Sequence, residues 1–211
     1  MKRFFLLLMT VLLAQSLTAE EIKPKGQEGA GKPTFSIYGE GGATLTSYRS
    51  MDMTYNPGFS TLASFHVGAG VNARFFKRNQ VSVKDGLLGI QAGVLYTQGG
   101  FVSGQQTVKG NYLCIPVCFQ LYPVKNLFLE TGPEACLNLG LTPEQFIVGD
   151  DNLDLRGLRA NDLKLAVGAG YILDTIPLGI SVKYLIGTNN FAKNLHWKSN
   201  QLRISVFYRF K

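Results

Sequence analysis

The chain of 211 residues has the length of one domain, and its 21 Lys and Arg against 14 Asp and Glu give a formal net charge of +7. Charged residues make up 17% of the chain, and the basic excess forms no run, which argues against nucleic acid as a partner. The 24 glycines disfavour a helical bundle, because each glycine inside a helix costs about 1 kcal/mol relative to alanine. An apolar fraction of 45% excludes a disordered chain.

The first segment, residues 1–19, is typical of a cleavable secretory signal peptide. Lys2 and Arg3 precede an apolar run from Phe4 to Leu13, and small or polar residues follow as far as Ala19. The apolar run is too short to span a bilayer as a helix. Residues 20–34 are charged and rich in Gly and Pro, and we expect them to form a flexible periplasmic lead-in.

The remainder of the chain, residues 35–211, alternates between apolar and other residues with a period of two. Successive side chains of a strand point to opposite faces, so each alternating run predicts a strand with one apolar face. We recognise eight such runs: Phe35–Leu45, Ala63–Phe75, Leu88–Tyr96, Leu113–Leu121, Leu127–Leu139, Leu163–Tyr171, Leu178–Ile186 and Leu202–Phe210.

The connections between these runs alternate between long and shorter segments, which is the layout of an up-and-down barrel in an outer membrane. The long connections are Ser47–Ser60, Gly99–Gly110, Gly140–Asn161 and Gly187–Asn200, and the shorter ones are Phe76–Leu87, Pro123–Asn126 and Ile172–Pro177. We therefore predict an all-β domain over residues 35–211, an eight-stranded antiparallel transmembrane β-barrel. Strands of about 9–11 residues would suffice for a tilted crossing, with the apolar face toward lipid.

Two segments of this domain resemble a known family. Residues 112–117, Tyr-Leu-Cys-Ile-Pro-Val, are similar to the YLxIPL signature of the PorT-like, porin-family outer-membrane β-barrels of Bacteroidetes, and residues 89–101 resemble the family's preceding strand and its glycine-rich exit. The resemblance implies a protein of the cell outer membrane that contacts outer-membrane lipid. It also implies that the barrel-insertion machinery reads an aromatic residue near the C-terminus, here Phe210.

The polar faces carry a set of ionisable residues that we expect to form a charge network in the lumen. They are Glu40, His66, Arg74, Glu130, Glu134, Lys164, Lys183, Arg203 and Arg209. The interior of an eight-stranded barrel is just wide enough for side chains to fill. Because an unpaired charge there would cost several kcal/mol, the charges should pair across the lumen and close it to diffusion. The alternative is a narrow path for ions or protons.

With the lumen filled, we expect function to lie in the extracellular loops, above all in Gly140–Asn161, as binding, adhesion or envelope and secretion scaffolding with an unknown protein or glycan partner. We predict no cofactor, no metal site and no enzyme activity. One alternative is an outer-membrane lipid-modifying hydrolase, for which His66, Ser64 and Glu40 supply the residue types of a triad. A second is a soluble periplasmic lipocalin-like barrel, with its apolar face turned inward around an apolar ligand.

The three cysteines all fall on the inward face. Cys114 and Cys118 lie on one strand about 13 Å apart, too far for a disulfide. If Tyr122 stands opposite Phe128 across the following turn, the same register places Cys114 opposite Cys136, at about 4.5–5.5 Å between Cα atoms. Cys114 and Cys136 are therefore a candidate disulfide, and the alternative is three small inward-facing side chains. Two prolines on these strands, Pro116 and Pro133, predict a local gap in the hydrogen-bond ladder.

Overall fold

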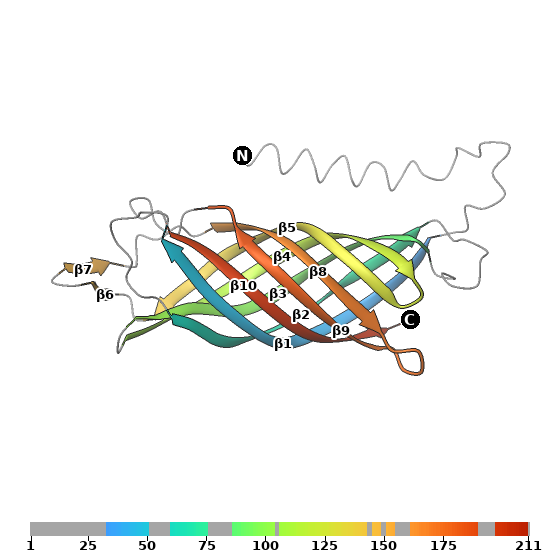
Figure 1. The fold of residues 1–211 in the computed structure, drawn as a ribbon, viewed down its shortest axis with the longest axis horizontal. Coiled ribbons are helices and arrows are strands. Elements are labelled where there is room, and N and C mark those ends of the chain that lie inside the picture. Colours follow the sequence, from blue (N-terminus) through green and yellow to red (C-terminus); the bar gives the residue numbers. More distant parts are fainter. Residues whose placement is uncertain are drawn as a thin grey trace. The chain divides into compact units, whose positions relative to one another are not determined.

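The computed structural model describes residues 33–50, 60–75, 86–103, 106–142, 145–148, 151–154, 161–189 and 197–210. Eight strands close into one antiparallel barrel in the order β1-β10-β9-β8-β5-β4-β3-β2, as the alternating runs predicted (Figure 1). They are β1 (Thr34–Ser50), β2 (Ser60–Phe75), β3 (Leu88–Ser103), β4 (Gln106–Val124), β5 (Leu127–Thr142), β8 (Asn161–Ile172), β9 (Leu178–Gly187) and β10 (Trp197–Phe210). The predicted signal peptide lies outside the described residues, as does the lead-in up to residue 32, and its last residue, Thr34, belongs to β1.

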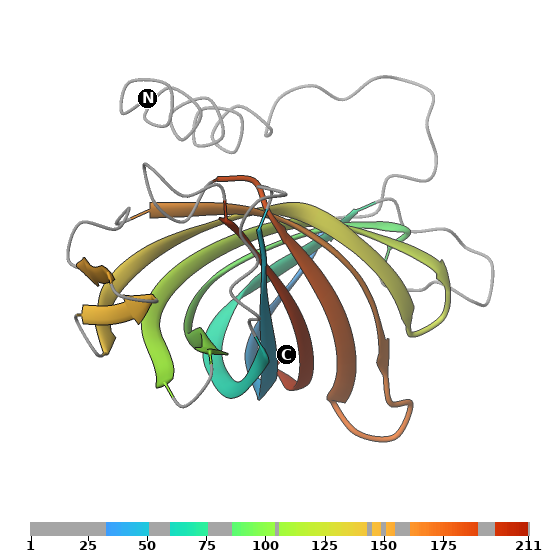
Figure 2. The same ribbon diagram turned by 60° about the vertical axis from the view of Figure 1, so that its left-hand side comes forward.

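Two faces of the barrel differ as the period-two pattern requires. The large apolar residues of the strands are exposed on the outer surface, where Phe35, Phe65, Val94 and Phe119 each expose about half of their area or more. The residues between them point inward and are buried, and they include most of the ionisable residues of the strands. Figure 2 shows how the strands curve around this interior. Within the described residues, no helix is long and apolar enough to cross a membrane.

Several strands are longer than a membrane crossing requires. β4 has 19 residues and β1 has 17, against the about 9–11 that a tilted crossing needs. The prediction of a long connection over Gly99–Gly110 was wrong, because β3 runs to Ser103 and β4 begins at Gln106. Phe101 and Val108 lie on these extensions and are fully buried inside the barrel. Burial of these two side chains stabilises the ends of β3 and β4, which extend beyond the stretch whose outer face is apolar and suited to lipid.

The connection between β5 and β8, predicted as a loop, contains a second small sheet. Its strands are β6 (Gln145–Val148) and β7 (Asp151–Asp154), which pair with each other in antiparallel register. In Figure 1 this hairpin stands at one end of the barrel, and β10 ends at the other. The tight β4–β5 turn at Lys125 and Asn126 lies at the β10 end. The longest connection of the barrel, between β5 and β8, carries this hairpin, and the longer loops of such barrels are extracellular. We therefore name the hairpin end the extracellular end and the β10 end the periplasmic end.

The register of β4 against β5 is the one that the cysteines and the turn predicted. Cys114 stands opposite Cys136, and Gln120 stands opposite Glu130. The ladder is interrupted between the pairs Pro116–Glu134 and Phe119–Thr131. Pro133 falls within this interruption, where it has no N–H to donate, so the predicted ladder gap is confirmed.

Candidate functional site in the barrel lumen

The lumen is crossed by an ion pair between strands that are not neighbours in the sheet. Arg203 of β10 donates two hydrogen bonds of 2.7 Å, from Nη1 and Nη2, to the two carboxylate oxygens of Glu134 on β5. Arg203 Nη2 also donates to Gln201 Oε1 at 3.0 Å. Both charged side chains are almost fully buried. A two-fold hydrogen-bonded pair of this kind fixes the positions of both groups in a site with little water.

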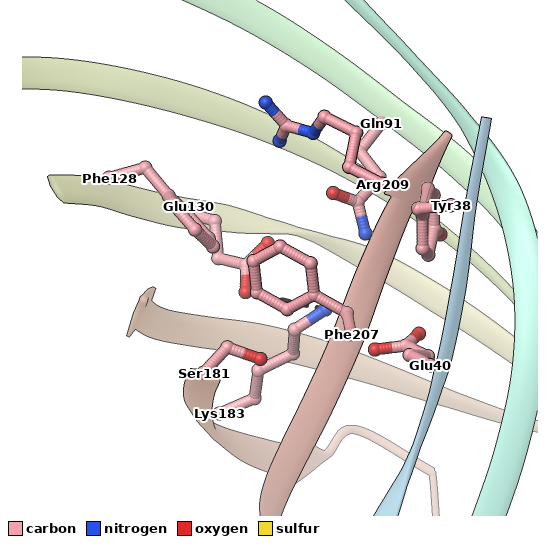
Figure 3. Close-up of a pocket in the computed structure, with 9 residues that line it drawn as sticks. All are labelled: Tyr38, Glu40, Gln91, Phe128, Glu130, Ser181, Lys183, Phe207 and Arg209. Atoms are coloured by element: carbon pink, nitrogen blue, oxygen red, sulfur yellow. Dashed lines mark ion pairs between the residues drawn. The ribbon is translucent and has the colours of Figure 1, made fainter. Parts of the chain in front are cut away.

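A second pair lies nearer the periplasmic end, where Lys183 Nζ of β9 is 3.3 Å from Glu130 Oε1 of β5. Figure 3 shows the two side chains converging, with Glu40 of β1 directed to the same region. The cavity among these residues measures about 10 Å³, which is room for about one water molecule. The lumen is therefore filled at this level, as the sequence predicted.

Lys164 pairs with a residue that the sequence reasoning missed. Its Nζ lies 3.6 Å from Asp162 Oδ2 on the same strand, and Asp162 also accepts a hydrogen bond of 3.0 Å from Ser199 Oγ. Residues 162 and 164 have the same parity along β8, so the period-two pattern already placed Asp162 inward. The sequence did not single it out because it falls between the predicted connection Gly140–Asn161 and the alternating run that begins at Leu163, whereas β8 already begins at Asn161.

Uncharged amides and hydroxyls occupy much of the lumen between the ion pairs, and Gln120 is the centre of this network. Its Oε1 accepts hydrogen bonds from Asn72 Nδ2 at 2.7 Å and Tyr122 Oη at 2.6 Å. Its Nε2 donates to Gln91 Oε1 at 2.7 Å and to Glu130 Oε2 at 3.1 Å. The predicted β4–β5 register placed Gln120 beside Glu130, as observed, but the sequence indicated nothing of the contacts of Gln120 with Asn72, Gln91 and Tyr122.

His66 is held by two hydroxyl groups. Nδ1 is 2.9 Å from Thr44 Oγ1 and Nε2 is 2.8 Å from Ser205 Oγ. Ser64 Oγ instead donates to the backbone oxygens of Gln98, at 2.7 Å, and Thr44, at 3.2 Å. The structure thus gives His66 and Ser64 separate partners, and it does not assemble the triad of the hydrolase alternative.

The periplasmic end of the lumen is closed by an aromatic layer of Tyr122, Phe128 and Phe207. The ring centroids of Tyr122 and Phe128 are 5.6 Å apart, and those of Phe128 and Phe207 are 5.9 Å apart. The Arg74 guanidinium carbon is 3.6 Å above the Tyr122 ring, and Arg209 Nη2 donates to Tyr122 Oη at 3.4 Å. The prediction that each lumen cation pairs with a carboxylate was therefore wrong for Arg209, whose partner is a phenol.

Two of the three cysteines are joined. The structure contains a Cys114–Cys136 disulfide between β4 and β5, with Cα atoms 4.0 Å apart, and Cys118 is a buried free thiol. Glu134 lies close enough that its carboxylate and the two sulfurs fall within 4.8 Å of one another. A metal ion binds the thiolate form of cysteine, and neither Cys114 nor Cys136 can form a thiolate while they are joined in the disulfide. This cluster is therefore not a metal site in the oxidised protein.

No family model matches the chain, and no curated protein sequence matches it. Among solved structures, Neisserial surface protein A is similar over 85% of this chain and 100% of its own, with a TM-score of 0.51 and 12% identity. This chain is a barrel of the outer-membrane type. Ail, the attachment invasion locus protein of Yersinia pestis, covers 87% of this chain and 100% of its own at 16% identity, with a TM-score of 0.43. At 12% identity the likeness to Neisserial surface protein A concerns the fold. This fold and the apolar outer face together support a place in the outer membrane.

Proposed function

We propose that the protein acts as a binding, adhesion or scaffolding protein of the outer membrane, through its extracellular loops and toward a protein or glycan partner. The observation that carries this proposal is the filled lumen. Buried ion pairs cross it, and the cavity beside Lys183 measures only about 10 Å³. An aromatic layer closes the periplasmic end. A barrel that is blocked in this way meets its surroundings at its two ends rather than through its interior.

The β5–β8 connection is the segment that we assign to the partner. It is the longest connection between strands of the barrel, and its β6–β7 hairpin stands at the extracellular end. Connections carried on a rigid scaffold are where binding residues concentrate. Export by the signal peptide of residues 1–19, and recognition of Phe210 by the insertion machinery, belong to the same proposal.

Deletion of residues 144–156 tests the assignment. We expect the deletion variant to reach the outer membrane and to keep the heat-dependent gel mobility of a folded barrel, but to lose the partners that the full chain retains in a pull-down from intact outer membrane or on a glycan array. The matched control replaces residues 190–195 of the β9–β10 connection with Gly and Ser. Partner retention after the first deletion, or failure of that variant to insert, would contradict the assignment.

The closed lumen can be tested separately in planar bilayers. We expect the full barrel to give no steady conductance to small ions, because buried ion pairs cross the lumen and an aromatic layer packs at its periplasmic end. Stepwise single-channel currents from the wild-type barrel would overturn this part of the proposal and would favour the narrow ion path instead.

We also propose that the protein works without catalysis, since His66 and Ser64 make their hydrogen bonds with different partners. His66→Ala should leave any lipid-directed activity of the purified barrel unchanged. The finer assignment to the PorT-like family of Bacteroidetes rests on residues 89–101 and 112–117. Recovery of secretion-machinery subunits in the pull-down would support it.

A further inference from the structure

A pocket of about 520 Å³ lies at the periplasmic end, between the β4–β5 and β8–β9 turns and the ends of β2 and β10. This volume falls within the range of pockets that bind small molecules and peptide segments. The pocket is lined by Arg74, Lys125, Asn126, Ile172, Leu173, Asp174, Thr175, Ile176, Pro177, Tyr208 and Arg209. None of these residues belongs to the extracellular loops, so the pocket is independent of the function proposed above.

Arg209 gives this pocket an available positive charge. In the part of the chain that the structure describes, Arg209 contacts Tyr122 Oη at 3.4 Å and no carboxylate, and its Nε is buried without a hydrogen-bond partner. Figure 3 shows its guanidinium turned away from the Lys183–Glu130 pair. Arg209 lines both the small lumen cavity and the pocket, so it stands at the boundary between them.

The acidic residue of the pocket is already engaged. Asp174 Oδ1 is 2.5 Å from Lys125 Nζ and accepts a hydrogen bond of 2.6 Å from Asn126 Nδ2. Asp174 therefore does not neutralise Arg209. A guanidinium with unused donors suits a carboxylate, which can accept two of its hydrogen bonds at once.

The rest of the pocket combines apolar and polar groups. Leu173 and Ile176 lie in the β8–β9 turn, outside the strands, and expose 40% and 46% of their surface. Thr175 and Asn126 bring hydrogen-bonding side chains beside them. An aliphatic side chain of a bound ligand can pack on Leu173 and Ile176, while a neighbouring peptide group of the ligand forms a hydrogen bond with the Thr175 hydroxyl or the Asn126 amide. Arg209 lines both this pocket and the small lumen cavity, so a ligand entering from the periplasm meets its side chain.

We propose that this mouth pocket binds a peptide carboxylate that follows an aliphatic residue, supplied by a periplasmic partner, with Arg209 as the residue that recognises the carboxylate. The barrel would then have a recognition site on each side of the membrane. The peptide is preferred to a fatty acid because the turns also line the pocket with Lys125, Asn126, Asp174 and Thr175, polar groups that suit peptide groups rather than a continuous alkyl chain.

The test uses the full mature barrel in lipid nanodiscs and a fluorescein-labelled peptide, Gly-Gly-Val-Leu, with a free C-terminal carboxylate. The matched probe is the same peptide with a C-terminal amide. Anisotropy titrations should show the amide binding about tenfold more weakly or worse, because a hydrogen bond to a charged group is lost. Arg209→Gln should weaken binding of the acid by a similar factor, and Arg209→Lys by less.

Two further variants separate binding from folding. Lys109→Gln removes an exposed charge at the extracellular end and should leave the titration unchanged. Thr175→Trp fills the pocket from the turn without touching the lumen pairs, and it should abolish binding while heat-dependent gel mobility stays normal. Equal binding of acid and amide, or an unchanged titration of Arg209→Gln, would overturn the proposal.

Two further measurements identify which molecule occupies the pocket. Laurate binding in place of the peptide would overturn the peptide assignment in favour of a fatty acid. Tighter peptide binding after deletion of residues 20–32 would show that the chain's own N-terminal segment fills the pocket, which also overturns it. An unchanged titration after that deletion supports a separate partner.

Discussion

Arg203 on β10 and Glu134 on β5 are joined by two hydrogen bonds of 2.7 Å, although two other strands, β9 and β8, separate them in the sheet. The contact therefore spans the interior instead of following the barrel wall. It fixes the two sides of the barrel relative to each other, and its removal should be felt throughout the molecule.

Loss of one partner of this pair should destabilise the barrel strongly. We expect Glu134→Leu or Arg203→Met alone to cost about 3–5 kcal/mol, because each leaves an uncompensated buried charge, whereas the double variant should cost much less than the sum. Urea unfolding of the barrel in liposomes measures the three values. Additive costs would mean that the pair contributes nothing beyond its separate side chains.

A charge introduced on the outer face should destabilise the barrel more, the deeper its position lies in the membrane. Val94→Arg, near the middle of β3, should cost about 2–4 kcal/mol, whereas Val124→Arg, at the periplasmic end of β4, should cost about 0–1 kcal/mol. The two valines are matched, since they expose 53% and 50% of their surface. The measurement is the free energy of unfolding from liposomes, and equal costs would contradict the outward assignment of Val94.

Gly170 should be intolerant of any side chain because an aromatic ring occupies the space beside it. A Cβ atom at this position would lie 2.3 Å from Cζ of Phe128. We expect Gly170→Ala to cost about 1–3 kcal/mol through overpacking, and Phe128→Leu in the same chain to recover part of the loss. Gly39→Ala is the matched control, since its Cβ would meet no atom closer than 3.9 Å. Equal losses at both glycines would show that the backbone, and not the ring, sets the cost.

The disulfide predicts a definite thiol count. Protein unfolded without reductant should show one free thiol, Cys118, and Cys118→Ser should show none. The bridge closes a separation of 22 residues, so its reduction should cost about 3 kcal/mol if it acts by restricting the unfolded chain. Three free thiols in the unreduced wild type would exclude the bridge.

The turn pair of Lys125 and Asp174 should give a small dependence of stability on pH. Hydrogen bonds from Lys125 and Asn126 lower the pKa of Asp174 below its ordinary value of 3.8. Its contribution is therefore present above that value and is lost as the pH falls through the lower folded-state pKa. Comparison of urea midpoints at about pH 6 and pH 2 should show a smaller drop for Asp174→Asn than for the wild type, and an equal drop would exclude this contribution. The effect should be small, because both side chains are exposed.

The faces of the strands followed from the sequence because parity is a local property. Every inward residue that the alternation assigned on β4, from Cys114 to Tyr122, is buried, and one assumed turn was enough to set the β4–β5 register. The partners across the lumen could not be predicted in this way. Whether Arg203 meets Glu134 or Glu130 depends on tilt and stagger summed over several strands, which no local pattern records.

The ends of the strands escaped prediction for a different reason. Alternation marks only the stretch that faces lipid, so the extensions carrying Phe101 and Val108 were assigned to a loop. The pocket at the periplasmic end was missed as well, because its lining comes from two turns and three strand ends that are distant in sequence.

The pairing of β1 with β10, from Ile37 opposite Phe210 to Ser50 opposite Trp197, sets a constraint on biogenesis. One edge of β1 pairs with β2, but its other edge finds a partner only in β10, the last strand, so the barrel cannot close until every strand is present. Until then two strand edges carry backbone groups that neither lipid nor another strand satisfies. A chain truncated before Trp197 should therefore accumulate as an open, protease-sensitive sheet in the periplasm rather than as a smaller barrel.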